Sequence, residues 1–166
     1  MSTVKHRILF VCIHNSARSQ MAEAFLKTLG GDNFEVESAG IEKGRLNPNV
    51  VQVMSEVGID ISKNKTTEVL DLLKEGNTYQ AVITVCDAAN AERCPVFPGM
   101  VKRVAWSFAD PSAFKGSQDE ILQQIRIVRD EIKEKVEGFI KEASDLKFWA
   151  NTEANNIVTD DYSKLD

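Results

Sequence analysis

The pattern of apolar and polar positions divides the chain into short apolar runs and longer stretches with helical spacing. The apolar runs predict strands over residues 7–12, 34–38, 81–86 and 101–106, and the unbroken run at 81–86 is typical of a central parallel strand. Apolar residues that recur every three or four positions predict helices over residues 17–29, 48–57, 66–74 and 120–140. Strands and helices therefore alternate, as they do in βαβ units of a parallel sheet.

Residues typical of helix ends support this division. Gly30 with Gly31 ends the first helix, and Asn47 followed by Pro48 supplies an N-cap and a first-turn proline for the second. We expect one three-layer, doubly wound α/β domain with right-handed crossovers and a four-stranded parallel sheet. Ligands of such sheets bind beyond the carboxyl ends of the strands, and Cys12 and Cys86 each end a predicted strand.

Length, composition and charge limit the kind of protein. The chain has 166 residues, 43% hydrophobic and 27% charged, which suffices for one domain with its own core. The net charge is −5 without a basic block, so we expect no nucleic acid partner.

No apolar run approaches the roughly 20 residues of a membrane span, and no signal peptide is recognisable, so we expect a cytoplasmic protein without membrane contact. Its three cysteines are then expected to be reactive or buried thiols.

The last part of the chain differs from the rest. Polar residues dominate after Trp149, although a few apolar residues remain. We therefore expect residues 1–141 to form the domain and residues 142–166 to form a polar tail, either strapped onto the body or disordered.

The turn between the first strand and the first helix carries a thiol. Five residues separate Cys12 from Arg18. The first N–H groups of a helix lack intrahelical partners, and together with the helix dipole they bind anions and stabilise a thiolate. The loop N–H groups can thus surround an oxyanion while Arg18 grips two of its oxygens, with Cys12 as the nucleophile. The expected oxyanion-binding residues are Ile13, His14, Asn15, Ser16, Ala17 and Arg18.

Two residues of this turn are expected to support the nucleophile. Asn15 suits a left-handed backbone conformation, and Ser19 can donate a hydrogen bond to a Cys12 thiolate. Ordinary turn and cap chemistry is the alternative explanation for both. The side chain of His14 either faces solvent or tunes the thiolate.

The run from Cys12 to Ser19 resembles the phosphate loop of the low-molecular-weight protein tyrosine phosphatase family, which includes the thioredoxin-coupled arsenate reductases. Residues 15–24, 38–42 and 46–48 are more similar to the reductase branch, and the resemblance extends over roughly residues 7–140. It implies the fold of the family and its general acid, an aspartate followed by proline, which Asp110 matches. A turn or N-cap aspartate before proline is the alternative for Asp110.

The other two cysteines distinguish hydrolysis from reduction. A phosphatase needs only water after Cys12 has attacked, whereas reduction of arsenic needs electrons from thiols. In the reductases, a second cysteine ends the third strand and a third follows shortly after, and Cys86 and Cys94 match them. The resemblance implies a thiol–arsenate adduct on Cys12, attack by Cys86 with release of arsenite, and transfer of the disulfide to Cys86–Cys94, which thioredoxin reduces. Asp110 would help to expel water.

The spacing of Cys86 and Cys94 adds a conformational expectation. Residues 87–93 are rich in helix formers, and a helix would hold the two cysteines ~12 Å apart. A disulfide needs Cα atoms within ~7 Å, so we expect this segment to refold on oxidation and to carry Cys94 inward. The alternative is that these cysteines are merely buried or in a loop and form no relay.

The chain departs from the reductase pattern at several positions. Ile13 and His14 stand where Thr-Gly is common, and Ala17 replaces a further cysteine. Some members bind a potassium ion with residues that align with Asn15, Glu23, Ser38 and an aspartate. Thr67 stands at the place of that aspartate, which argues against the ion.

The sequence thus predicts a cytoplasmic arsenate reductase for arsenic detoxification, without a metal or a tightly bound cofactor. Thioredoxin is the expected external reductant, and phosphate or sulfate are the expected competing oxyanions. The enzyme alternative is a tyrosine phosphatase with a Cys12 phosphoenzyme, which would tolerate replacement of Cys86 and Cys94. The other alternative is an oxyanion- or redox-sensing binding module without turnover.

Overall fold

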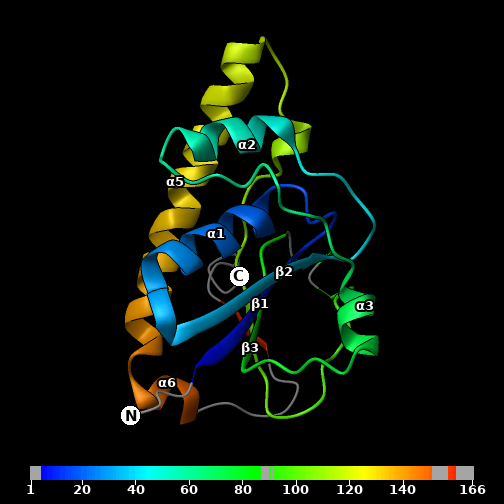
Figure 1. Ribbon diagram of the computed structural model, residues 1–166, viewed down its shortest axis with the longest axis vertical. Helices are drawn as coiled ribbons and strands as arrows, with labels where there is room; N and C mark the ends of the chain where they lie inside the picture. The colour runs from blue at the N-terminus through cyan, green and yellow to red at the C-terminus, as the bar shows by residue number, and fades with distance from the viewer. Residues whose placement is uncertain (1–4, 87–89, 91, 151–156, 160–166) are drawn as a thin grey trace.

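A parallel sheet forms the middle layer of the protein, as Figure 1 shows for the computed structural model, which describes residues 5–86, 90, 92–150 and 157–159. The strands lie in the order β2-β1-β3-β4-β5, and each neighbouring pair is parallel. They are β1 (His6–Cys12), β2 (Phe34–Gly40), β3 (Ala81–Thr84), β4 (Lys102–Ala105) and β5 (Ile157–Thr159). The first four strands confirm the predicted four-stranded parallel sheet, and the C-terminal segment adds a fifth.

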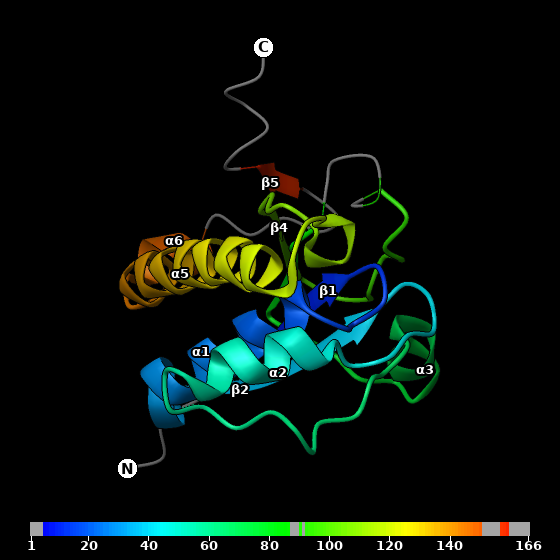
Figure 2. The ribbon, with the colours of Figure 1, turned by 90° about the horizontal axis from the view of Figure 1, so that it is seen from above.

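Helices cover both faces of the sheet. They are α1 (Arg18–Gly30), α2 (Pro48–Ser55), α3 (Val69–Lys74), α5 (Gln118–Ala143) and α6 (Leu146–Ala150), with 3-10 turns η1 (Gly31–Asn33) and η2 (Pro111–Ala113). Figure 2 shows α1 and α5 on one side of the strands and α3 on the other. The predicted three-layer architecture is therefore confirmed.

Alternating side chains of β1 build the two cores. Ile8 and Phe10 belong to the larger core, which lies beneath α1, α2 and α5, whereas Leu9 and Val11 belong to the smaller core beneath α3. All four side chains are fully buried. An unbroken apolar run is needed because both faces of this strand are covered.

Local signals account for the helix starts. The side chain of Asn47 accepts a hydrogen bond from the N–H of Asn49, and Pro48 opens α2, as predicted. Ser117 and Glu120 form a capping box, so α5 begins at Gln118, two residues before the predicted start.

Four predicted elements are shorter than expected, among them α2, which ends at Ser55, and β4, which spans Lys102–Ala105. The helix expected from residue 66 begins at Val69, because the carbonyl of Thr67 accepts a hydrogen bond from the N–H of Gly40 and holds this stretch against the end of β2. The strand expected over 81–86 ends at Thr84, so Cys86 lies just beyond it. The helix expected over residues 87–93 falls largely on residues 87–89 and 91, which lie outside the described residues.

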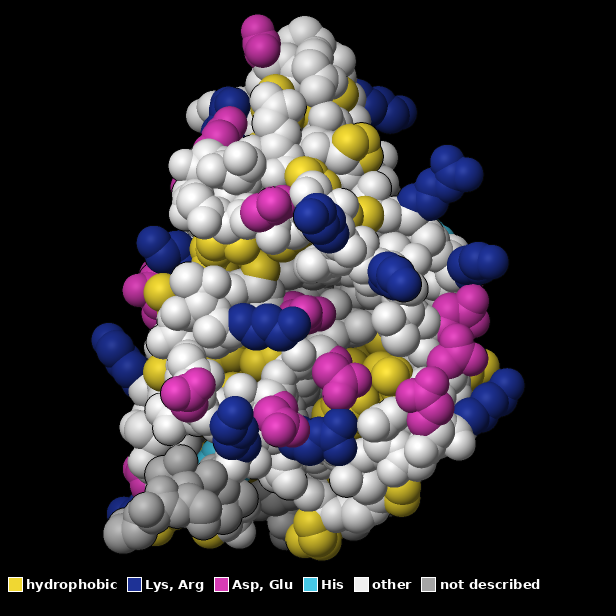
Figure 3. Space-filling view, viewed as in Figure 1, with side chains coloured by type: hydrophobic (Ala, Val, Ile, Leu, Met, Phe, Trp, Pro, Cys, Tyr) yellow, Lys and Arg dark blue, Asp and Glu magenta, His cyan; other side chains and the backbone are white. Residues whose placement is uncertain are grey.

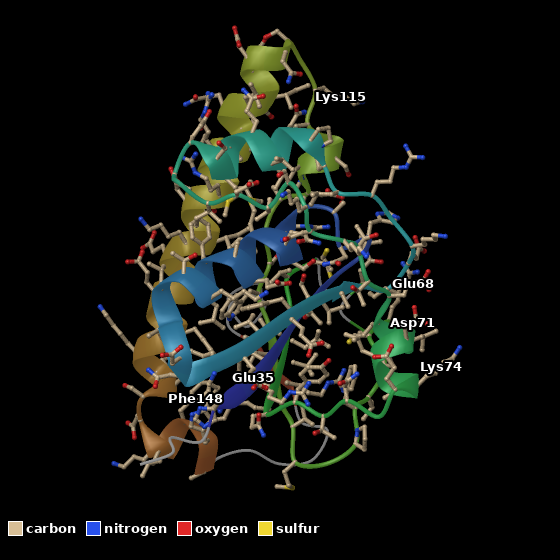
Figure 4. The ribbon with its side chains drawn as sticks, viewed as in Figure 1. Glu35, Glu68, Asp71, Lys74, Lys115 and Phe148 are labelled. Carbon is tan, nitrogen blue, oxygen red and sulfur yellow. The ribbon has the colours of Figure 1, made fainter. Side chains whose placement is uncertain are left out.

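The described part of the C-terminal tail is attached to the body. Trp149 stacks on His6 with ring centroids 4.0 Å apart, and Lys102 donates a hydrogen bond to the carbonyl of Phe148. Figure 4 shows Phe148 at the lower end of the molecule, at the opposite end from Lys115. Beyond it, β5 pairs with β4, for example Val158 with Val104.

Side chains of both charges are mixed across the face seen in Figure 3. None of the helices within the described residues is both long and apolar enough to cross a membrane.

Candidate active site

The loop between β1 and α1 surrounds the thiol of Cys12 with hydrogen-bond donors. The backbone N–H of Asn15 donates to Cys12 Sγ at 3.2 Å, and Ser19 Oγ lies 2.8 Å from the same sulfur. Cys12 is 2% exposed and Ser19 is fully buried. The N-cap of α1, Ala17, makes no side-chain cap bond, so no cap side chain takes the first N–H groups of the helix. These N–H groups are oriented to bind an anion next to the sulfur.

Asn15 determines which way the Ser19 hydroxyl points. Asn15 has φ 55°, the left-handed conformation that was expected for it. Its Nδ2 donates to Ser19 Oγ at 2.8 Å and to Ser38 Oγ at 2.9 Å, while its Oδ1 accepts from the N–H of Thr67 at 2.9 Å. Because Ser19 Oγ already accepts from Asn15, its proton is available for Cys12 Sγ. Both the hydroxyl and the Asn15 N–H therefore stabilise a thiolate.

The segment between β2 and α2 supports the loop from behind. The N–H of Ile41 donates to the carbonyl of Cys12 at 3.0 Å, and the N–H of Asn47 donates to that of Ser16 at 2.9 Å. A Cβ at Gly40 would lie 2.7 Å from the backbone nitrogen of Asn15. From the sequence, Ile41 is notable only through the family resemblance and Asn47 also as a helix N-cap. Their support of the loop is seen only in the fold.

The side chain of His14 points away from the nucleophile. Its Nε2 lies 3.1 Å from Glu42 Oε2, and its side chain is 47% exposed. Of the two expectations for His14, the outward-facing side chain is the one observed, whereas its backbone remains part of the loop.

Arg18 and Asp110 meet although 92 positions of sequence separate them. Arg18 is 4% exposed, and its Nη1 donates to the carbonyl of Phe108 at 3.2 Å. Its Nη2 lies 3.5 Å from Asp110 Oδ2. The other oxygen of Asp110, Oδ1, accepts from both the N–H and the hydroxyl of Ser112 and caps η2. Asp110 therefore combines the capping role with a position at the mouth of the loop.

Cys86 follows the strand next to the one that ends at Cys12. Val11 pairs with Thr84, and the N–H of Val85 donates to the carbonyl of Val11, so the two strands stay together to their ends. Neighbouring strands lie about 4.8 Å apart, which brings the Cys86 backbone close to the loop. Cys86 is fully buried, and all three cysteines are in the thiol form.

Cys94 lies in the smaller core, beneath α3. It is 4% exposed and belongs to the same cluster as Leu9, Val82 and Phe97. Burial raises the pKa of its thiol to about 11, and Arg103 opposes part of this rise. In the thiol form Cys94 is thus already buried, and Phe97 and Val101 belong to the same core. The expectation that this segment refolds on oxidation concerns the disulfide form and stays a prediction.

The residues that align with a potassium site in some family members are hydrogen-bonded to one another, because Asn15 donates to Ser38 and Ser38 donates to Glu23. Glu23 accepts from the hydroxyl of Ser38 with one oxygen and contacts the ammonium of Lys27 with the other. Lys27 thus places a positive charge next to Glu23, and Thr67 brings no carboxylate. Within the described residues no group of three His, Cys, Asp or Glu side chains could hold a metal ion.

The chain is similar to a family of phosphatases and to proteins that reduce arsenate. The sequence profile described as low molecular weight phosphotyrosine protein phosphatase matches residues 7–147. An "Arsenate reductase" of Bacillus subtilis is 46% identical over 134 residues, which cover 80% of this chain and 93% of that protein.

Two solved structures have the same fold. "An arsenate reductase in oxidized state" superposes with a TM-score of 0.68 at 34% identity and covers 82% of this chain and 98% of its own. A "thioredoxin-dependent arsenate reductase" of Corynebacterium glutamicum has a TM-score of 0.54 at 26% identity and covers 84% of this chain and 65% of its own.

Proposed function

This chain belongs to the low molecular weight phosphotyrosine protein phosphatase family, and from that premise we propose that it reduces arsenate to arsenite by a relay of three thiols. The observation that carries the proposal is the position of Cys86. A second buried thiol follows the strand next to the one that ends at the nucleophile Cys12. Hydrolysis of a phosphate ester has no use for it, whereas a two-electron reduction requires it.

The loop binds the oxyanion and presents it to the sulfur. The N–H groups of residues 13–17 and the guanidinium of Arg18 hold the oxygens of arsenate, and phosphate or sulfate compete because they are tetrahedral anions as well. Cys12 attacks arsenic as a thiolate, stabilised by Ser19 and by the N–H of Asn15. Asp110 gives a proton to the departing oxygen, which leaves as water.

The reduction itself takes place at sulfur. The thiolate of Cys86 attacks Cys12 Sγ, the S–As bond breaks, and its electron pair stays on arsenic, which leaves as arsenite. Two thiols have then lost two electrons and form a Cys12–Cys86 disulfide. The thiolate of Cys94 attacks Cys86 and frees Cys12, which leaves a Cys86–Cys94 disulfide for an external dithiol to reduce.

Burial of Cys94 implies that this last step needs motion. A thiol with a pKa of about 11 is almost entirely protonated at neutral pH. Its attack on Cys86 therefore requires a conformational change that brings it out of the smaller core. This requirement supports refolding of the segment between the two cysteines during the cycle.

The proposal also covers the reductant, the cellular role, potassium and the division of the chain. Thioredoxin is the proposed reductant, as in the similar protein from Corynebacterium glutamicum. A cytoplasmic role in arsenic detoxification is consistent with thiol chemistry, and turnover is expected to be independent of potassium because Lys27 neutralises Glu23. Residues 1–141 are the proposed catalytic domain, and the described part of the tail, residues 142–150 and 157–159, is the proposed strap.

The deciding experiment measures arsenate-dependent thiol consumption with thioredoxin, glutaredoxin or glutathione as donor. We expect thioredoxin to support turnover of the wild type. Cys94→Ser should yield about one arsenite per enzyme and then stop, whereas Cys86→Ser should yield none, because its Cys12 adduct cannot be resolved by an internal thiol. Cys12→Ser is the matched inactive control.

Two outcomes would contradict the proposal. Sustained hydrolysis of an aryl phosphate by Cys86→Ser and Cys94→Ser, without arsenate reduction by the wild type, would favour the phosphatase. Binding of arsenate without turnover on any thiol donor would favour a binding module.

A further inference from the structure

Glu42 contacts two parts of the proposed relay at once. It lies in the segment between β2 and α2, and its backbone N–H donates to the carbonyl of Ile13 at 2.7 Å. Its Oε2 lies 3.1 Å from His14 Nε2, and its Oε1 accepts from Arg93 Nη2 at 2.6 Å. Ile13 and His14 belong to the oxyanion loop, whereas Arg93 directly precedes Cys94. One carboxylate therefore joins the loop to the residue next to the third thiol.

The backbone around Glu42, which bridges His14 and Arg93 with its carboxylate, is tightly packed against the loop. A Cβ at Gly40 would lie 2.7 Å from the backbone carbonyl carbon of His14, and one at Gly44 would collide with the carbonyl oxygen of the same residue. The backbone around Glu42 thus fits closely against the loop.

At the other end of the Glu42–Arg93 ion pair, Arg93 is bonded to Asn90. The N–H of Arg93 donates to the carbonyl of Asn90 at 3.0 Å, and its Nη1 donates to Asn90 Oδ1 at 2.8 Å. Arg93 is the main reason why the pKa of Glu42 lies below its usual value, so this carboxylate is charged at neutral pH. The ion pair therefore holds Arg93, which is also bonded to Asn90, and Cys94 follows directly in the smaller core.

We propose that Glu42 is a positioning residue of the thiol relay: through Arg93 it keeps Cys94 in its buried position until disulfide exchange draws that segment away. This proposal rests on the proposed function, because only a relay needs Cys94 to be both held and released. The Glu42–Arg93 ion pair is weak enough to hold Cys94 and still release it. The side chains of Glu42 and Arg93 are 48% and 45% exposed, and an exposed ion pair contributes little enough to open readily.

The expected consequence is a change in the reactivity of Cys94 in the thiol form of the protein. Without the ion pair, the segment opens more often, and Cys94 should react with iodoacetamide about two- to fivefold faster, the size expected for an exposed pair. The KM for arsenate should change by less than about twofold, because the N–H groups that bind the oxyanion are untouched.

The test compares the full-length wild type with Glu42→Gln, Arg93→Gln and the charge-swapped pair Glu42→Arg with Arg93→Glu. Alkylation of each cysteine is followed by mass spectrometry of its peptide. Lys43→Ala is the matched control, because it removes a neighbouring exposed charge outside the bridge. Circular dichroism and inorganic phosphate binding verify that each variant is folded. We expect both single variants to expose Cys94, the control to match the wild type, and the charge swap to restore slow alkylation.

Equal Cys94 alkylation in the wild type and both single variants would overturn the proposal. So would faster alkylation in Lys43→Ala, which would indicate a general loosening. The assay needs no arsenate, so its result is separate from the proposed function. If the wild type does not reduce arsenate, the proposed function is wrong, whatever the alkylation rate of Cys94. If the wild type reduces arsenate but the variants alkylate Cys94 at the wild-type rate, only the positioning role of Glu42 is wrong.

Discussion

Asn15 is fully buried and uses its backbone and its side chain for different tasks. Its N–H faces Cys12 Sγ, and its side chain orients the hydroxyl of Ser19 while binding Ser38 and the backbone of Thr67. A buried amide with this many partners has little freedom to reorient. The hydrogen bonds that stabilise the thiolate are therefore in place before the substrate arrives.

Asp110 divides its two carboxylate oxygens between structure and chemistry. Oδ1 is occupied by Ser112, and Oδ2 faces Arg18. We predict that Asp110→Asn lowers kcat for arsenate by about 10²- to 10⁴-fold, because the amide keeps the cap but cannot donate a proton as an acid does. Initial rates with thioredoxin in excess measure this effect.

A control variant tests the capping role of Asp110 Oδ1 separately from the proposed acid role of Oδ2. Ser112→Ala removes one hydrogen bond to Oδ1 and leaves Oδ2 unchanged, so we expect kcat to fall by less than about threefold. If Asp110→Asn behaved like Ser112→Ala, the role of Asp110 would be limited to capping η2.

At the scale of elements, the segment between β2 and α2 forms the rear wall of the oxyanion loop. We predict that Gly40→Ala weakens inorganic phosphate binding by about tenfold or more and lowers the free energy of unfolding by roughly 1–3 kcal/mol. The reason is that the new Cβ would lie 2.7 Å from backbone atoms of His14 and Asn15, which cannot move aside as a flexible side chain can. Calorimetry and urea denaturation give the two quantities.

Gly138 supplies a matched control in α5. A Cβ there would meet no atom within 4 Å, so Gly138→Ala should leave phosphate binding unchanged and stabilise the helix by up to about 1 kcal/mol. Unchanged phosphate affinity in Gly40→Ala would show that the loop does not depend on this close fit.

At the scale of the whole molecule, α6 packs at the end of the sheet away from the catalytic loop. Trp149 packs on His6, the first residue of β1, whereas Cys12 is the last. Seven strand residues span roughly 20 Å, so Trp149 and the thiol of Cys12 lie at opposite ends of β1. The tail is therefore expected to serve stability rather than catalysis.

Two truncations test whether the tail contributes to stability but not to catalysis. Removal of residues 151–166 should leave kcat for arsenate within about twofold of the full chain. Removal of residues 145–166 also deletes Phe148 and Trp149, which pack against the larger core, and should lower the free energy of unfolding by about 2–4 kcal/mol. Urea denaturation and steady-state rates measure both effects, and a large loss of kcat in the shorter truncation would contradict the separation.

The sequence by itself determined the elements and the nucleophilic loop. Apolar periodicity located the strands and helices, and the spacing of Cys12 and Arg18 indicated an anion-binding turn. The left-handed backbone of Asn15 and the cap of α2 by Asn47 were also predictable. These features depend on residues within about two helical turns of each other in the sequence, so backbone sterics and local hydrogen bonds specify them.

Only the tertiary structure decided which distant residues meet. Sheet order brings Arg18 to Asp110, and packing of separate segments brings Glu42 to Arg93 and buries Cys94 in the smaller core. It also ends β3 before Cys86 and adds β5 to the edge of β4. A hydrophobic pattern specifies that a strand or helix is buried but not against which partner, because many pairings bury the same apolar area; the complete set of packed contacts selects one.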